Sequence, residues 1–133
     1  MNLSGCPNIE YLYCDDNELT TLDLKSCSNL VTLYCGENKL KSLDLRENAK
    51  LDYLDCGNNE LTEILFGKDA RLLHLGCYNN KLTAINPNVV LTNDVSENPN
   101  VPTGEIVCFG NNFDQTTKDA LYAWRDAGGE LDV

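Results

Sequence analysis

The sequence predicts an α/β solenoid, in which short structural repeats stack into a single domain over residues 1–133. Four stretches align at a constant offset of 21 residues and share the pattern L-x-x-L-x-C-x-x-N-x-L: 9–19, 30–40, 51–61 and 72–82. Ile9 is the one conservative exception. One such unit cannot bury its apolar face without a neighbour, so a fixed period of this length indicates a stack of repeats.

The period continues beyond the fourth repeat after an insertion. Ile106, Cys108, Asn111 and Phe113 match the pattern again, although Cys77 to Cys108 spans 31 residues instead of 21. The extra residues fall in a stretch rich in Pro and Asn, a composition typical of loops. We therefore divide the domain into regular repeats 1–85, an insertion loop 86–102 and an irregular C-terminal repeat 103–133.

The C-terminal repeat is expected to contain a helix and a last strand. Thr116 or Thr117 is a suitable N-cap, and Gly128 stands where the helix should end. Between them, apolar residues recur at helical spacing: Ala120, Leu121, Trp124 and Ala127. Residues 131–133 repeat the apolar alternation of 106–108 and are expected to form a sixth strand.

These motifs resemble the leucine-rich repeat family, whose consensus L-x-x-L-x-L-x-x-N/C-x-L is met five times, with Thr103 departing at the first position of the fifth copy. The tail L-T-x-L-D-L at 19–24 is similar to the short repeats of bacterial cell-surface members. The resemblance implies a curved stack with a parallel concave sheet of about six short strands, and a convex side made mostly of turns and extended or 3-10 segments. It also implies a protein partner on the concave sheet and a secreted or cell-surface location.

The chain begins in the middle of a repeat and shows no signal peptide at its start. We therefore expect a fragment of a longer protein. Unpaired terminal repeats would leave apolar ends, so we expect a monomer or an end-to-end dimer.

The charge balance disfavours several classes of ligand. The chain has 10 Lys and Arg against 21 Asp and Glu, a net charge of -11. Nucleic-acid backbones and anionic membrane surfaces need clustered basic residues, so neither is an expected partner. No apolar run is long enough to insert across a bilayer.

Cysteine and asparagine form two ladders of equivalent positions. Cys14, Cys35, Cys56, Cys77 and Cys108 occupy the inward strand position where the consensus has Leu. We expect small buried hydrophobes there and no metal or cofactor, since paired C-x-x-C spacing is absent and the chain has one His. Asn17, Asn38, Asn59, Asn80 and Asn111 should satisfy backbone groups as each strand enters its turn.

Two further cysteines, Cys6 and Cys27, share a position outside the strand in neighbouring repeats. Stacked equivalents lie within possible disulfide range. The sequence favours two reduced thiols on the convex turn, and a disulfide is the alternative.

The candidate binding residues follow from strand alternation. If Leu12 and Cys14 point into the core, their neighbours point outward onto the concave sheet. This phase and its flanks select Tyr11, Tyr13, Asp15, Tyr34, Glu37, Tyr53, Asp55, His74, Tyr78, Glu105 and Phe109. Five of the six tyrosines fall on this face, which has several acidic residues and no Lys or Arg. Tyrosine is enriched at recognition surfaces because it offers area and a hydroxyl with few rotors to order.

The favoured function is a non-enzymatic protein-interaction module whose partner carries exposed basic residues. One alternative is a glycan-binding surface, with tyrosines stacked on sugar rings. Another is a structural spacer of a larger surface protein, with the binding site on missing repeats or on the insertion. Tyr and Asp would then serve only to keep an exposed sheet soluble.

An enzyme is not expected, and no catalytic residues are predicted. His74 has no identifiable nucleophile beside it, and the carboxylates sit on an open sheet where burial cannot raise a pKa for acid catalysis.

Overall fold

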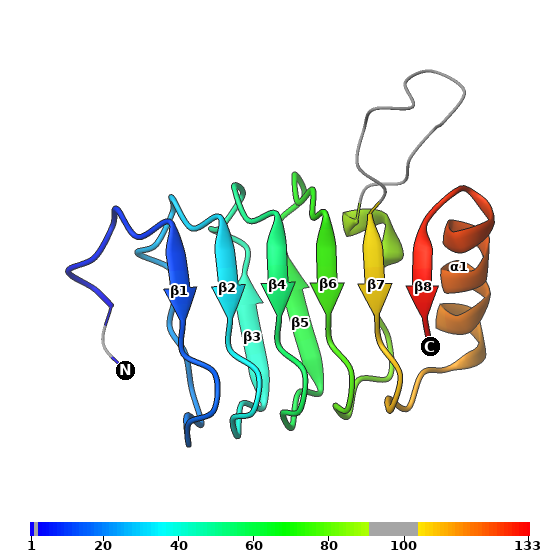
Figure 1. The fold of residues 1–133 in the computed structure, drawn as a ribbon, viewed down its shortest axis with the longest axis horizontal. Coiled ribbons are helices and arrows are strands. Elements are labelled where there is room, and N and C mark those ends of the chain that lie inside the picture. The colour runs from blue at the N-terminus through cyan, green and yellow to red at the C-terminus, as the bar shows by residue number, and fades with distance from the viewer. Residues whose placement is uncertain (2, 91–103) are drawn as a thin grey trace.

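The computed structural model describes residues 1, 3–90 and 104–133, which form a solenoid of stacked repeats (Figure 1). Its main layer is a six-stranded parallel sheet of order β1-β2-β4-β6-β7-β8. The strands are β1 Tyr11–Tyr13, β2 Thr32–Tyr34, β4 Tyr53–Asp55, β6 His74–Gly76, β7 Glu105–Val107 and β8 Glu130–Asp132. The predicted α/β solenoid, with about six parallel strands and a helix near the C-terminus, is confirmed.

Strand pairing keeps strict register between equivalent residues. Leu12 pairs with Leu33, Leu33 with Leu54, and Leu54 with Leu75. The last three of these leucines have no exposed surface, and Ile106 continues the row on β7. Burying such a side chain contributes roughly 1.5–3 kcal/mol, so the row of leucines is a main source of stability along the stack.

The cysteine ladder lies inside this core as predicted. Cys35, Cys56 and Cys77 have no exposed surface, and Cys14 and Cys108 are buried. Burial raises the pKa of these thiols, to about 12 for Cys108 and well above the ordinary value for Cys56. Among the described residues, no group of three His, Cys, Asp or Glu side chains is placed to hold a metal ion.

The asparagine ladder joins each repeat to the one before it. Asn59 Oδ1 accepts a hydrogen bond from the Leu40 N–H at 2.9 Å, and its Nδ2 donates to the Cys35 and Cys56 carbonyls at 3.0 and 3.1 Å. Asn38, Asn80 and Asn111 make the equivalent bonds. Asn17, in the first repeat, is exposed, and among the described residues its side chain donates to the carbonyls of Cys14 and Asp15 in its own turn.

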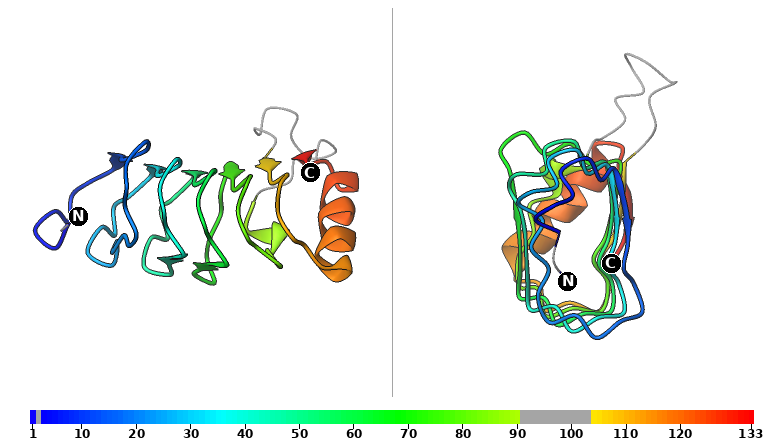
Figure 2. Two further views of the ribbon diagram at one scale, coloured as in Figure 1. Left: turned by 90° about the horizontal axis from the view of Figure 1, so that it is seen from below. Right: turned by 90° about the vertical axis from the view of Figure 1, so that its left-hand side faces the viewer.

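The opposite side of the solenoid holds a second sheet that the sequence did not predict. β3 (Ser42–Leu45) and β5 (Glu63–Phe66) pair in parallel behind the main sheet (Figures 1 and 2). The extended segments expected on the convex side therefore pair with each other in two neighbouring repeats.

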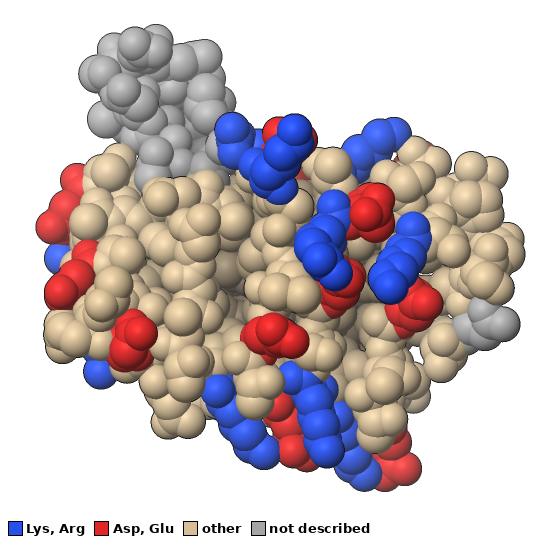
Figure 3. Space-filling model, turned by 180° about the vertical axis from the view of Figure 1, so that it is seen from behind, with Lys and Arg blue, Asp and Glu red and all other residues tan. Residues whose placement is uncertain are grey.

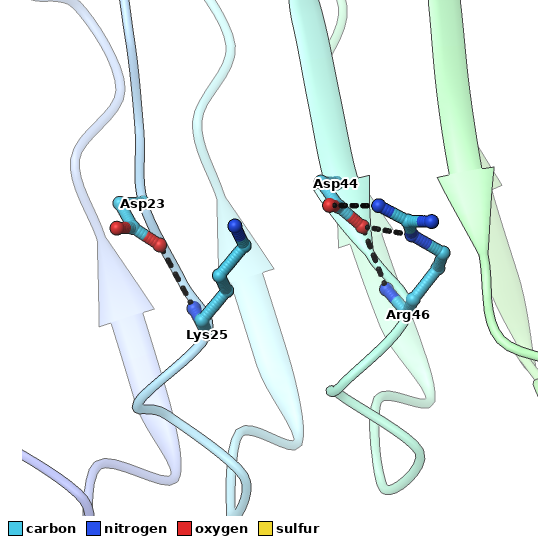
Figure 4. Close-up of polar contacts among 4 residues, drawn as sticks. All are labelled: Asp23, Lys25, Asp44 and Arg46. Atoms are coloured by element: carbon cyan, nitrogen blue, oxygen red, sulfur yellow. Dashed lines mark hydrogen bonds and ion pairs between the residues drawn. The ribbon is translucent and has the colours of Figure 1, made fainter.

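Aspartates hold the turn after β3 and the equivalent turn one repeat earlier. Asp44 makes two contacts with the Arg46 guanidinium, at 2.9 and 2.8 Å, and these bonds lower the pKa of the carboxyl to about 2 (Figure 4). One repeat earlier, Asp23 accepts a hydrogen bond from the Lys25 N–H at 3.2 Å (Figure 4).

The C-terminal helix α1 (Gln115–Asp126) starts earlier than predicted. Its N-cap is Asp114, whose carboxylate accepts a hydrogen bond from the Thr117 N–H at 2.7 Å, and not Thr116 or Thr117. Thr117 is buried in the first turn, and its N–H and its side chain both hydrogen-bond to Asp114, which lowers the pKa of that carboxyl. The helix ends before Gly128, whose φ of 104° suits glycine, and β8 follows as predicted.

The expected insertion loop 86–102 starts with ordered structure. Pro87–Val89 forms the 3-10 helix η1, and Val90 bridges to Leu72. Trp124 of α1 donates its Nε1–H to the Val90 carbonyl at 3.0 Å, which fixes this segment against the helix. Residues 91–102 of the expected loop lie outside the described residues.

Cys6 and Cys27 differ in environment, since Cys6 is exposed and Cys27 has no exposed surface. Both are free thiols in the structure. In the next repeat Asn48 takes the equivalent position, is buried, and donates to the Cys27 carbonyl at 2.8 Å.

No helix among the described residues has the length and apolar character that a membrane span requires.

The Asn59→Ala variant should lower the free energy of unfolding by about 1–3 kcal/mol, because the buried Leu40 N–H loses its partner. Asn17→Ala is the matched control, since the exposed Asn17 side chain bonds within its own turn, and should stay within about 0.5 kcal/mol of the parent. Urea unfolding of the three proteins measures both effects. Equal losses in the two variants would contradict the role assigned to the ladder.

The free energy of unfolding should fall as the pH rises above 9.0. This is the ordinary pKa of a cysteine thiol, and it applies to the unfolded chain. The folded state keeps its buried thiols protonated while the unfolded state loses those protons, so each buried thiol lowers the free energy of unfolding by up to about 1.4 kcal/mol per pH unit. Urea unfolding as a function of pH measures the slope.

Cys56→Ala should make that slope shallower, whereas Leu54→Ala, a buried neighbour without a titrating group, should lower stability and leave the slope unchanged. The same slope in Cys56→Ala and the parent would contradict a contribution from the buried thiol.

Candidate binding face

The outward side of the six-stranded sheet carries the candidate residues, and we call this surface the sheet face. It comprises the outward residues of the main strands and the residues that flank them. Tyr11 and Tyr13 are 59% and 64% exposed, and Phe109 is 38% exposed. Lys and Arg side chains lie on the opposite side of the molecule, interspersed with Asp and Glu (Figure 3). The charges on that side are partly paired, whereas the sheet face is acidic.

Four rings form a continuous aromatic column across the sheet face: Tyr13, Tyr34, Tyr53 and His74. Successive ring centroids are 5.1, 5.1 and 4.3 Å apart, and the interplanar angles of 10° to 27° are those of stacked rings. Tyr13 pairs with Tyr34 in the sheet, but Tyr34 pairs with Asp55, so the column shifts by two residues to reach Tyr53. Stacked pairs of this kind contribute about 0.5–1.5 kcal/mol each beyond their burial.

His74 closes the column on one side and contacts a carboxylate on the other. Its Nδ1 lies 2.7 Å from Glu105 Oε2, and the two residues are paired in the sheet. A carboxylate only accepts hydrogen bonds, so Nδ1 carries the proton in this contact. Glu105 therefore fixes the orientation of the imidazole and its tautomer.

A second aromatic pair lies beside the column. Tyr78 stacks on Phe109 with ring centroids 5.3 Å apart. The Tyr78 ring lies over Gly57 of the neighbouring repeat, where a Cβ would collide with it. Glycine at this outward position allows the ring to lie flat against the sheet.

The charge of Asp55 acts on a tyrosine in each of the two aromatic sets. Burial, a hydrogen bond with Tyr34 and the charges of Asp55 and Glu105 raise the pKa of Tyr53. Burial followed by the charges of Asp55 and Glu37 raises the pKa of Tyr78. Both phenols therefore stay protonated at neutral pH and can donate or accept hydrogen bonds.

The residues after the strands form a polar edge to the sheet face. Glu37, Asn58 and Asn79 adopt positive φ angles of 51° to 52° and are joined through their side chains. Asn58 Nδ2 donates to Glu37 Oε1 at 2.6 Å, and Asn79 Nδ2 donates to Asn58 Oδ1 at 2.8 Å. Glu37 is thus part of a fixed polar row along the sheet.

The structure brings together most of the predicted site residues. Tyr11 pairs with Thr32 and stacks on no ring among the residues that the structure describes, and Asp15 is exposed at the first repeat, so neither belongs to the column. The outward glycines were not among the predicted site residues. A sequence pattern could have indicated their role: a glycine at an outward position whose equivalent in the next repeat is aromatic, as Gly57 and Tyr78 are.

Comparison with solved structures places this fold among known solenoids. The functional domain of InlJ from Listeria monocytogenes, which includes a cysteine ladder, is 35% identical over 84% of this chain, with a TM-score of 0.63. A leucine-rich repeat protein from Leptospira interrogans is 22% identical over 93% of this chain, with a TM-score of 0.67. No family model matches the chain, and no curated protein gives a significant match.

The chain is therefore a leucine-rich repeat protein. It spans 23% of the InlJ chain and 31% of the Leptospira chain. The similarity to InlJ agrees with the cysteine ladder observed here, in which Cys35, Cys56 and Cys77 are fully buried.

Proposed function

We propose that the chain is a non-enzymatic protein-interaction module that binds a basic segment of its partner across the sheet face. The aromatic column carries this proposal. Tyr13, Tyr34, Tyr53 and His74 form a row of stacked rings on the solvent side of the sheet, where they contribute nothing to the core. Rings in such a row are already ordered, so a ligand that packs on them freezes few rotors.

Charge complementarity supports a basic partner. Asp15, Asp55 and Glu105 lie on the sheet face together with Glu37 at its edge, and none of the ten Lys and Arg residues lies on the outward positions of the main strands. Basic residues elsewhere pair with local acids, as Lys39 does with Glu18 at 3.0 Å and Lys81 with Glu60 at 2.9 Å. An acidic aromatic surface of this kind steers a positively charged segment and discriminates against acidic ones.

Peptide and glycan arrays test the proposal. The protein is applied to peptides of graded Lys and Arg content and, in parallel, to a panel of glycans. Basic peptides should bind the parent protein and fail to bind a Tyr34→Ser, Tyr53→Ser double variant. Binding should weaken with salt, since the screening length falls from about 10 Å at 0.1 M to about 3 Å at 1 M ionic strength.

Tyr122→Ser is the matched control, because Tyr122 is the sixth tyrosine, is 41% exposed and lies on α1 away from the main strands. It should keep full binding, and circular dichroism should show that both variants are folded. Peptide binding that persists in the double variant would contradict the proposal. Salt-insensitive binding to glycans, lost in the double variant, would assign the face to sugars, and no binding at all would favour a spacer.

A further inference from the structure

Asp55 holds a negative charge near the centre of the sheet face. It is half-buried on β4, and its Oδ1 accepts a hydrogen bond from the Gly57 N–H at 3.0 Å. Among the described residues, it makes no ion pair, and its Oδ2 has no hydrogen-bond partner. The carboxylate is therefore available to pair with a cationic group that a ligand supplies, and such charge-assisted hydrogen bonds are among the stronger ones in proteins.

Gly76 brings the carboxylate close to the imidazole of His74. Asp55 and Gly76 face each other in the sheet register. The carboxylate carbon of Asp55 and the Nε2 of His74 lie 3.3 and 3.1 Å from the point where a Cβ on Gly76 would sit. A larger residue at Gly76 would separate the two groups, so the glycine creates a shared space above the sheet.

The groups around this space offer hydrogen-bond acceptors. Because His74 Nδ1 donates to Glu105, the neutral imidazole has its lone pair on Nε2, beside Asp55. Asp55 contributes a second acceptor. The phenol groups of Tyr53 and Tyr78 are close enough for the charge of Asp55 to raise their pKa values. The space is therefore rich in acceptors and lined by ring systems, and no Lys or Arg of the described part of the chain pairs with Asp55 there.

We infer that Asp55 and His74 form an arginine subsite, in which the guanidinium of a partner arginine pairs with the Asp55 carboxylate, donates to His74 Nε2 and packs against the neighbouring rings. This inference rests on the proposed function and names the partner side chain that anchors it. Arginine fits better than lysine, because its planar fork has five donors, is weakly hydrated and stacks on aromatic faces.

Amide NMR tests the subsite, since the N–H groups of Gly57 and Gly76 report from its floor. The protein is titrated with N-acetylarginine methylamide, with the corresponding lysine compound and with its citrulline analogue, which has the shape of arginine and no charge. EDTA is present throughout, so that no metal ion contributes. The arginine compound should shift both glycine signals, the lysine compound should bind several-fold more weakly, and citrulline should give no saturable shift.

Asp55→Asn keeps an acceptor for the Gly57 N–H and removes the charge. It should weaken arginine binding by about tenfold or more, the range expected for losing a hydrogen bond to a charged group. Asp69→Asn is the matched control, since it removes one charge at an exposed position of the turn after β5, outside the sheet face, and should change affinity less than about twofold.

Three outcomes would overturn the subsite: equal binding of arginine and citrulline, equal binding of arginine and lysine, or unchanged arginine affinity in Asp55→Asn. The failures of the two proposals are distinguishable. If array peptides lose binding in the double tyrosine variant but keep it in Asp55→Asn, the sheet face binds the partner and the arginine subsite is wrong. If arginine binds at Asp55 and no array peptide depends on the tyrosines, the partner-binding role is wrong.

Discussion

The structure depends on parallel pairing in strict register between equivalent residues of successive repeats. Because neighbouring strands lie about 4.8 Å apart, any residue that recurs at the 21-residue period meets its own copy. Leu33 meets Leu54, and the cysteines stack in the core. The asparagine amides convert this stacking into a chain of hydrogen bonds, since Asn59 satisfies a backbone N–H of the preceding repeat. Each of these asparagines therefore supplies a hydrogen-bond partner that the preceding repeat lacks.

The same constraint creates the aromatic column. Inward residues of the strands form the hydrophobic core. Outward residues can therefore vary without loss of packing in that core. Tyr13 and Tyr34 stack because they are equivalent, while Tyr34 and Tyr53 stack although they are not. The column continues across the sheet because a ring reaches the diagonal neighbour when Asp55 takes the paired position. The shift places Asp55 beside the rings, which gives the sheet face its central charge.

The sequence predicts the features that recur at the 21-residue period. It does not predict those that depend on contacts between particular side chains or segments of neighbouring repeats. The solenoid, the six strands and the inward cysteines follow from alternation and a fixed period, which are local properties. Pairing between β3 and β5 does not follow, because it depends on how the convex segments stack. Asp114 caps α1 ahead of the predicted threonines, and Thr117 supports this cap by bonding to the Asp114 carboxylate through its N–H and its side chain. The diagonal stacking of Tyr53 depends on its side-chain conformation, and the approach of Asp55 to His74 depends on the side-chain conformations of both residues beside Gly76, so neither follows from the repeat period.

Hydroxyl-radical footprinting of the tyrosines would test most directly whether the sheet face is the binding surface. The protein is oxidised alone and with the basic peptide that binds it most tightly, and the modification of each tyrosine is read by mass spectrometry. The account predicts protection of Tyr13, Tyr34 and Tyr53 and unchanged modification of Tyr122 on α1. Protection confined to Tyr122, or no protection of the column under saturating peptide, would contradict it.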